Sequence, residues 1–256
     1  DEDSDDDTTD TRPCIMGDVM HSTPEAINFG NPQDPTSPDV RVVFGTNAGF
    51  LHMIESDSGN ESWAFFPKEV APIVPILFKN EPDDDHPYGV DGAPAVWLYD
   101  NNGDGSIVAG DDHAYLFFGL RRGSIVGEGQ NGGGYYALDI TTPDSPSLLW
   151  QVNQSDLTEL GQSWSKPTPT LVPGHDGPVV IIGAGYDDHK DSLAVGTADS
   201  EGRGIYVLDA TDGTLVWGVT PGADSDTNRQ ELGLVDSVPA QVTTLDTNGD
   251  QVTDRM

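Results

Sequence analysis

An all-β fold of repeated four-stranded units, a β-propeller, is predicted by three observations on this 256-residue sequence. A motif comprising an alternating apolar strand, an acid, a turn and a Trp-bearing strand recurs around Trp63, Trp150 and Trp217. Glycine-rich turns separate strands of period-two patterning, as propeller blades require. A strand introduced by a small residue and a proline recurs upstream, and its prolines are spaced by 70, 73 and 72 residues: Pro24, Pro94, Pro167 and Pro239.

The strands of each unit follow one another in the same order. The first unit contains "EAINF", "VRVVFG", "FLHMIE" and "ESWAF". The second contains "APAVWLY", "AYLFFG", "YYALD" and "LLWQV", and the third contains "TPTLV", "VVIIG", "IYVLD" and "LVWGV". Each stretch has the length and the apolar, β-branched or aromatic content of a strand.

The units are therefore expected at about 20–67, 92–153 and 166–220, with the first strand of a fourth from about 238. They form one partial propeller domain over 15–256. A propeller closes its ring with about four to eight blades. The remainder of the propeller is consequently expected outside this chain, supplied by further sequence or by a partner.

Two other structural interpretations carry less weight. A β-sandwich of about seven strands per domain does not explain a match every 70 residues or so. A helix is expected only as a single turn within 68–81, because Pro72 and Pro75 limit its length.

The composition is strongly acidic, with 44 acids against 11 bases and a formal net charge of −33. Such a surface repels nucleic acid and anionic lipid headgroups and attracts cations. No run of about 18 apolar residues exists, so no membrane span is predicted. The simplest interpretation of the charge is a secreted protein from a salty habitat, and an acidic surface alone does not indicate a calcium protein.

The N-terminal segment 1–14 is nearly all acidic residues and Thr up to residue 11, and is expected to be disordered because it cannot bury a core. No signal peptide is visible and residue 1 is Asp, which suggests a processed chain or a piece of a larger one. Cys14 is the single cysteine, so no internal disulfide is expected, and any partner lies outside the chain.

Two Asp/Asn/Gly stretches, "DNNGDGSIVAGD" at 100–111 and "DTNGDQVTD" at 246–254, are the candidate metal sites. Both follow the first strand of a unit, so both are expected in the loop to the second strand. In so acidic a chain, about one chance match to Asp-x-[Asp/Asn]-x-Asp is expected, and the alternative is a solvated turn. A further acid and a shared place in the repeat favour Ca²⁺.

We predict the ligands from the alternation of residues along each loop. Oxygens at every second position turn inward, where they can coordinate a hard cation that takes 6–8 ligands. The second stretch offers side chains at positions 1, 3, 5 and 9 and the carbonyl of position 7: Asp246, Asn248, Asp250, Asp254 and Val252. The first resembles an EF-hand loop, with a carbonyl at position 7 and Asp in place of Glu at position 12: Asp100, Asn102, Asp104, Ser106 and Asp111.

A family resemblance extends over about 15–256. The strings "GDVMHSTP", "VVFGTNAGFLHMIESDSGNESWAFFP", "YGVDGAP", "GGGYYALDIT", "LLWQ", "VVIIGAGY", "IYVLDATDG" and "DTNGD" occur in this order. The series resembles the propeller domain of the PilC/PilY family of type IV pilus tip adhesins and pilus biogenesis factors. The family domain is a modified seven-bladed propeller, and this chain resembles its first half.

The resemblance implies that 246–254 matches the family's nine-residue calcium loop, with Gln251 where glycine is common. It also implies a non-enzymatic protein at the cell surface, pilus tip or outer membrane. Its expected partners are minor pilins and a host or abiotic surface. Calcium is expected to modulate pilus extension and retraction, and hence twitching motility.

Two rival functions remain open. The repeats also resemble the tryptophan-docking motifs of pyrroloquinoline-quinone dehydrogenases, but one cysteine excludes the adjacent Cys–Cys pair that many of those enzymes carry. The other rival is a calcium-stabilised extracellular scaffold unrelated to pili. The six histidines show no regular spacing typical of a zinc site.

Overall fold

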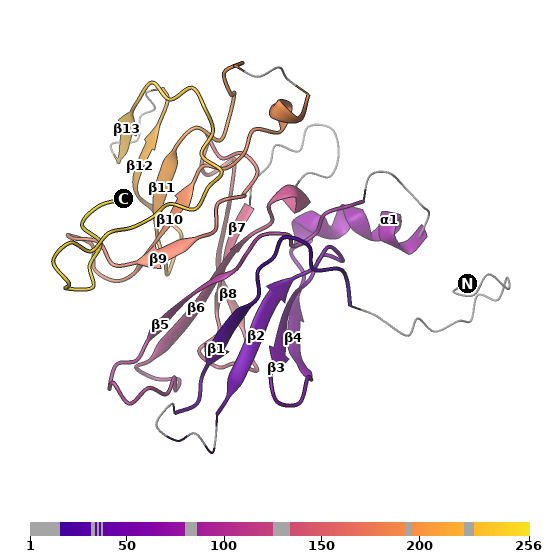
Figure 1. Ribbon diagram of the computed structural model, residues 1–256, viewed down its shortest axis with the longest axis vertical. Helices are drawn as coiled ribbons and strands as arrows, with labels where there is room; N and C mark the ends of the chain where they lie inside the picture. Colours follow the sequence, from indigo (N-terminus) through magenta and orange to yellow (C-terminus); the bar gives the residue numbers. More distant parts are fainter. Residues whose placement is uncertain are drawn as a thin grey trace, which may run out of the picture.

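A computed structural model describes residues 16–31, 34, 36, 38–79, 86–124, 134–192, 196–222 and 228–256. Three antiparallel sheets follow one another along the chain, coloured indigo, magenta and orange in Figure 1. The predicted all-β class with four-stranded antiparallel sheets is confirmed. The expectations for 1–14, including Cys14, lie outside the described residues.

The strands of each sheet lie in sequence order. The first sheet consists of β1 (Glu25–Asn28), β2 (Val40–Gly45), β3 (Leu51–Glu55) and β4 (Glu61–Phe65). The second consists of β5 (Ala95–Tyr99), β6 (His113–Gly119), β7 (Gly134–Asp139) and β8 (Ser147–Asn153). The third consists of β9 (Thr168–Thr170), β10 (Val179–Gly183), β11 (Ile205–Asp209), β12 (Leu215–Thr220) and β13 (Arg229–Glu231).

The third sheet departs from the predicted four strands, because β13 adds to β12 in parallel. The segment from Val238 on, where the sequence predicts the first strand of a fourth unit, forms no extended ladder. It makes single bridges, from Val238 to Gly185 and from Val252 to Leu171. A strand requires a run of paired backbone groups, and this segment, yellow in Figure 1, has only isolated ones.

Helical structure is longer than the single turn predicted within 68–81. The 3₁₀ helix η1 (Lys68–Ile73) runs into α1 (Val74–Lys79). Pro75 falls in the first turn of α1, where the missing N–H is not needed. The side chains of Val70 and Ile73 on η1 are buried, whereas no side chain of α1 is buried. Two short 3₁₀ helices follow the strands of other sheets: η2 (Arg122–Ser124) and η3 (Asp188–Asp191).

The two main cores lie between consecutive sheets. Strand β6 serves both, because alternate side chains leave its two faces. Leu116 and Phe118 join the core shared with the first sheet, while Tyr115 and Phe117 join the core shared with the third. A smaller cluster covers the far face of the third sheet and includes Val242 from the C-terminal segment.

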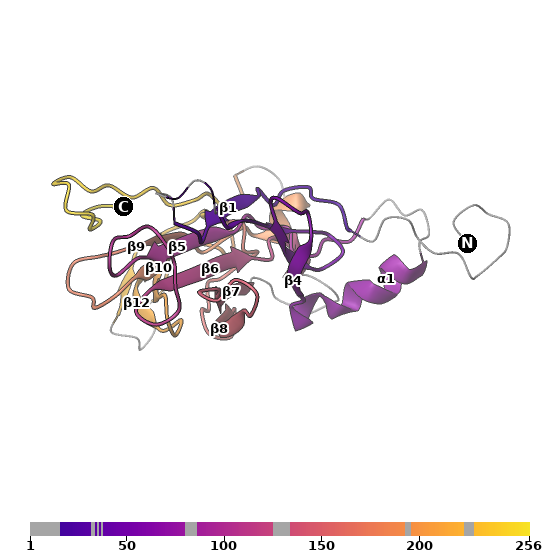
Figure 2. The same cartoon turned by 90° about the horizontal axis from the view of Figure 1, so that it is seen from below.

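The first strands of the sheets lie beside one another, β1 next to β5 and β5 next to β9. Lys166, just before β9, reaches across to Glu25 on β1, with Nζ 3.2 Å from the carboxylate. The sheets therefore fan out from their first strands. Figure 2 shows the C-terminal segment and α1 at opposite ends of the molecule. Among the described helices, none is long and apolar enough to cross a membrane.

Repeated tryptophans link each sheet to the next. The indole Nε1 of Trp63 donates to the carbonyl of Pro143 at 2.8 Å, and that of Trp150 donates to the carbonyl of Ala210 at 2.8 Å. Both carbonyls belong to the turn after the third strand of the following sheet. Trp150 is buried, at 6% exposed, while Trp63 and Trp217 are half-buried.

Glycine closes the second strand of every sheet, at Gly45, Gly119 and Gly183, because another backbone segment passes there. A Cβ at Gly45 would lie 2.1 Å from the carbonyl oxygen of Val90, and one at Gly183 would lie 2.2 Å from that of Val238. Even an alanine would force these segments apart, so the repeat of glycine follows from close packing.

Replacing Trp150 by Ala should lower the free energy of unfolding by about 3–5 kcal/mol, because it empties a buried site between two sheets. Trp150→Phe, which keeps an aromatic ring but loses the indole hydrogen bond, should cost less. Urea unfolding followed by far-UV circular dichroism measures both. Equal stability of Trp150→Ala and the unmodified protein would contradict the docking role.

Gly183→Ala should lower the free energy of unfolding by about 1–3 kcal/mol through overpacking against the Val238 carbonyl. Gly233→Ala is the matched control, because a Cβ there meets nothing within 4 Å. Thermal melting of the two variants makes the comparison. A loss of similar size in both would show that the close approach at Gly183 is not the cause.

Candidate metal sites

The first acidic stretch lies between the first and second strands of its sheet, as predicted, whereas the second is closed by an isolated antiparallel bridge and not by two strands. The loop from Asp100 to Asp112 joins β5 to β6 and is closed by the pair Tyr99 and His113. The second loop is closed by the bridge between Leu245 and Arg255. In each loop, the two residues that pair across its base are the neighbour before the first Asp and the neighbour after the last Asp.

Side-chain oxygens at positions 1, 3 and 5 of the first loop accept backbone N–H groups from within the same loop. Asp100 accepts at 2.7 and 2.6 Å, Asn102 at 2.8 Å and Asp104 at 2.8 Å, and the donors are Gly103, Gly105, Asp104 and Ser106. Such Asx turns wind the backbone around the side-chain oxygens.

The second loop repeats this pattern position by position. Asp246 accepts at 2.6 and 2.8 Å, Asn248 at 2.9 Å and Asp250 at 2.9 Å, and the donors are Gly249, Gln251, Asp250 and Val252. Positions 4 and 6 have positive φ in both loops, at Gly103, Gly105, Gly249 and Gln251. Gln251, at φ 68°, therefore adopts the left-handed conformation that glycine adopts without strain.

The acid that closes each loop accepts the N–H of position 2. In the second loop Asp254 accepts the N–H of Thr247 at 2.8 Å. In the first loop Asp112 accepts the N–H of Asn101 at 2.9 Å and that of Val108 at 2.9 Å, and it is 5% exposed. Asp111, the acid predicted at position 12, is exposed. Asp112 is thus the counterpart of Asp254, and the sequence prediction missed it.

These hydrogen bonds stabilise the ionised carboxylates. The N–H groups of Gln251 and Gly249 lower the pKa of Asp246, and the hydroxyl and N–H of Thr247 lower the pKa of Asp254. The N–H groups of Val108 and Asn101 lower the pKa of Asp112. Each of these carboxylates therefore carries its charge at neutral pH, as a cation ligand must.

The donor set of both loops is carboxylate, amide and backbone oxygen, which fits a hard cation such as Ca²⁺. Neither loop brings three Asp, Glu, His or Cys side chains as close together as another group in the described part of the chain. That group is Asp187, Asp188 and His189, whose ligand atoms lie within 4.8 Å of one another. A cation at the loops would accordingly rely on Asn and carbonyl oxygens as well as on carboxylates.

The group at 187–189 has a structural explanation. The buried Asp187 caps η3 by accepting the N–H of His189 at 3.0 Å, and it accepts the N–H of Ser200 at 2.6 Å. Its carboxylate also raises the pKa of His189. The oxygens of Asp187 are thus engaged in holding the loop together.

The described geometry defines a class: an all-β protein of consecutively packed sheets, with two equivalent Asp/Asn loops, one between β5 and β6 and one closed by the Leu245–Arg255 bridge. No family model matches the chain. A solved structure does match it: the crystal structure of the C-terminal domain of Pseudomonas aeruginosa PilY1. It aligns with a TM-score of 0.53 and 25% identity, covering 84% of this chain and 35% of that one.

Curated relatives are similar in sequence. The type IV pilus biogenesis factor PilY1 of P. aeruginosa strain PAO1 is 30% identical over 213 residues, or 75% of this chain. The protein of strain UCBPP-PA14 is 28% identical over 80% of the chain, and a PilY1 homolog of Xylella fastidiosa is 26% identical over 88%. The resemblance in the sequence motifs is thereby confirmed: the chain is homologous to PilY1-type pilus biogenesis factors. It spans less than a fifth of their length, 17%, 17% and 14% respectively.

Asp112→Ala should accelerate hydrogen exchange at the amides of Asn101 and Val108, because it removes both acceptors. Asp111→Ala is the control and should leave those two amides protected. The lowered pKa of Asp112 also sets a pH dependence. Its stabilising contribution is fully present above the unfolded value of about 3.9 and is lost as pH falls through the lower folded value.

Hydrogen exchange read by NMR, in calcium-free buffer, separates the two variants. Equal protection in both would show that Asp112 does not close the loop.

Proposed function

We propose that this chain is a calcium-binding, non-enzymatic propeller segment of a type IV pilus biogenesis factor or tip adhesin. The observation that carries the proposal is the similarity to PilY1 at 30% identity over 75% of the chain. A function in pilus biogenesis is what the names of those relatives state. We extend that function to this chain, and we include in it adhesion to a host or abiotic surface and contact with minor pilins at the pilus tip.

The three sheets are proposed to be the first blades of a propeller. Their first strands are neighbours, each sheet packs on the next, and Trp63 and Trp150 dock across the two interfaces. A third interface is partly made, because Val242 packs in one cluster with Trp217 on the far face of the third sheet. The remainder of the ring is proposed to lie outside this chain.

The proposed calcium ligands are those of the two equivalent loops. The second loop offers Asp246, Asn248, Asp250 and Asp254 with the carbonyl of Val252. The first offers Asp100, Asn102 and Asp104 with the carbonyl of Ser106, and it is closed by Asp112 or, by the EF-hand count, by Asp111. The like charges of each loop repel one another, and a divalent cation relieves that repulsion. An extracellular module needs only weak affinity, on the order of 10⁻⁴–10⁻³ M.

A structural role for the tryptophans favours a non-enzymatic protein. The indoles of Trp63 and Trp150 are hydrogen-bonded to carbonyls of the neighbouring sheet, where they hold the turns that follow β7 and β11. The proposed place of action is outside the cell, at the pilus tip or the outer membrane. There calcium would act by ordering the two loops and so modulating pilus extension and retraction.

Titration calorimetry with Ca²⁺ should find two sites in the unmodified protein and one in each of Asp250→Ala and Asp104→Ala. The loops lie on different hairpins, so each variant should leave the other site intact. Comparing Asp111→Ala with Asp112→Ala assigns the closing acid of the first loop. Identical titrations of unmodified protein, Asp250→Ala and Asp104→Ala would exclude both loops as the site.

Full-length protein carrying Asp250→Ala should support pilus assembly but change twitching motility, because the loop lies apart from the cores between the sheets. Surface piliation and twitching zones of the producing bacterium measure the two effects separately. Deletion of the gene without any effect on piliation or twitching would overturn the pilus assignment even if calcium binds.

A further inference from the structure

A recurrent acid ends the third strand of each sheet, at Glu55, Asp139 and Asp209. In the first and third sheets this acid faces a base of the same sheet. The guanidinium of Arg41 lies 3.5 Å from Glu55, and the imidazole Nε2 of His175 lies 3.0 Å from Asp209. In these two sheets the repeat therefore places a basic side chain against this carboxylate.

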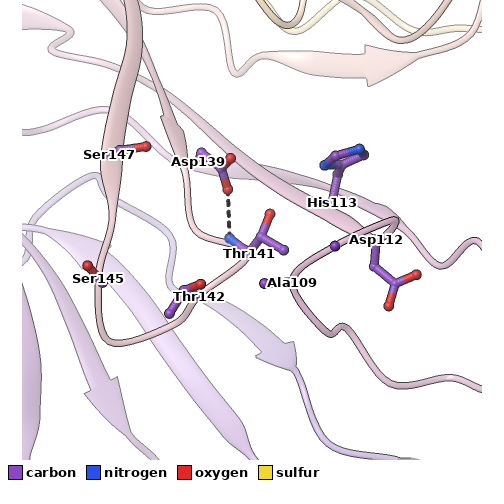
Figure 3. A pocket seen from close by; sticks show the side chains of 9 residues that line it. Ala109, Asp112, His113, Asp139, Thr141, Thr142, Ser145 and Ser147 are labelled. Atoms are coloured by element: carbon purple, nitrogen blue, oxygen red, sulfur yellow. Dashed lines mark hydrogen bonds between the residues drawn. The ribbon is translucent and has the colours of Figure 1, made fainter.

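The second sheet breaks the pattern. Asp139 accepts the N–H of Thr141 at 2.9 Å, but no base within the described ranges forms an ion pair with it. Asp139 instead lines a cavity of about 240 Å³ between the turn 139–147 and the segment 109–113. Figure 3 shows this turn curving around the cavity, with the Asp139 carboxylate directed to Thr141.

The lining of the cavity is polar. The residues that line it include Thr142, Ser145, Ser147 and His113. Asp112 also borders the cavity, but both of its oxygens accept N–H groups of the acidic loop, and in Figure 3 its carboxylate points away from Asp139. Asp139 is consequently the carboxylate that a guest would meet.

The turn that forms one wall is held in place by the first sheet. Trp63 donates to the carbonyl of Pro143, and Arg41 donates to the Asp144 carboxylate at 2.9 Å. Because the first sheet already holds this turn in place, ligand binding does not have to pay the entropy of ordering it, and this favours binding at a small site.

We propose that this cavity binds the guanidinium or ammonium group of a basic side chain on a partner protein, with Asp139 as its counter-ion. The first sheet pairs the equivalent acid with a guanidinium and the third pairs it with an imidazole, whereas no described base of the second sheet forms an ion pair with Asp139. The net charge of −33 attracts a cation and disfavours an anion. A guanidinium presents several donors in one plane, and these match a carboxylate flanked by hydroxyl oxygens.

This proposal does not depend on calcium binding or on the pilus assignment. Its counter-ion, Asp139, is not one of the proposed calcium ligands of either loop. The probe for its test is Nα-acetyl-arginine methylamide, titrated into the protein in calcium-free buffer. Backbone amide shifts of Thr142 and Ser145 report binding by NMR. We expect saturable shifts at these residues in the unmodified protein.

Asp139→Asn should weaken the probe's binding by about tenfold or more, as loss of a charge-assisted hydrogen bond implies. Asp209→Asn is the matched control: it neutralises an equivalent acid that already has its base, and binding should stay unchanged. Shifts that rise without saturation, or that are equal in Asp139→Asn, would overturn the proposal.

Ser147→Lys provides an independent variant, because Ser147 is the cross-strand partner of Asp139. The new ammonium should pair with Asp139, as neighbours across a sheet do, and should abolish probe binding without lowering the melting temperature. Retained binding in Ser147→Lys would contradict the site. Calcium chloride and methyl glucoside complete the test: saturable shifts with either, and none with the arginine probe, would overturn the proposal in favour of a metal or a saccharide site.

Discussion

The docking of a tryptophan into the next sheet is the interaction on which the arrangement depends. Trp63 and Trp150 each combine a packed indole with one hydrogen bond to a carbonyl of the following turn. Within the described residues, neighbouring sheets share no backbone ladder, so side-chain packing and single polar contacts set their relative position. The indole bond adds a fixed direction to that packing. It also fixes the turn that receives it, and in the second sheet that turn forms the wall of the Asp139 cavity.

The repeat made this architecture predictable from sequence. The tryptophans of the first two sheets dock in the same way, and the glycine at the end of the second strand has the same steric reason in every sheet. What did not repeat was predicted poorly. Strand β13 pairs in parallel with β12 because a segment from outside the repeat meets its edge. The helices at 68–79 depend on the burial of Val70 and Ile73, which local sequence does not specify.

The candidate loops show the same division. Asx turns are local, so positions 1, 3 and 5 follow from spacing alone. The closing acid is not local, because the register of the hairpin decides which residue faces the start of the loop. Counting twelve residues selects Asp111, whereas the pairing of Tyr99 with His113 brings Asp112 to the N–H of Asn101. Strand register outweighs loop spacing here, because a shift by one residue reverses the side-chain direction.

The two loops differ by four residues between position 7 and the closing acid, and the extra length has a structural use. Ile107, 7% exposed, enters the core between the first and second sheets, and its N–H donates to the carbonyl of Phe29 at 3.1 Å. The shorter loop is anchored instead to the third sheet, where Thr253 donates to the Leu171 carbonyl at 2.8 Å. Each loop is therefore tied to a sheet beyond its own hairpin. A cation that orders either loop would then stiffen a contact between neighbouring parts of the repeat, which gives a local binding event a route to the arrangement of the sheets.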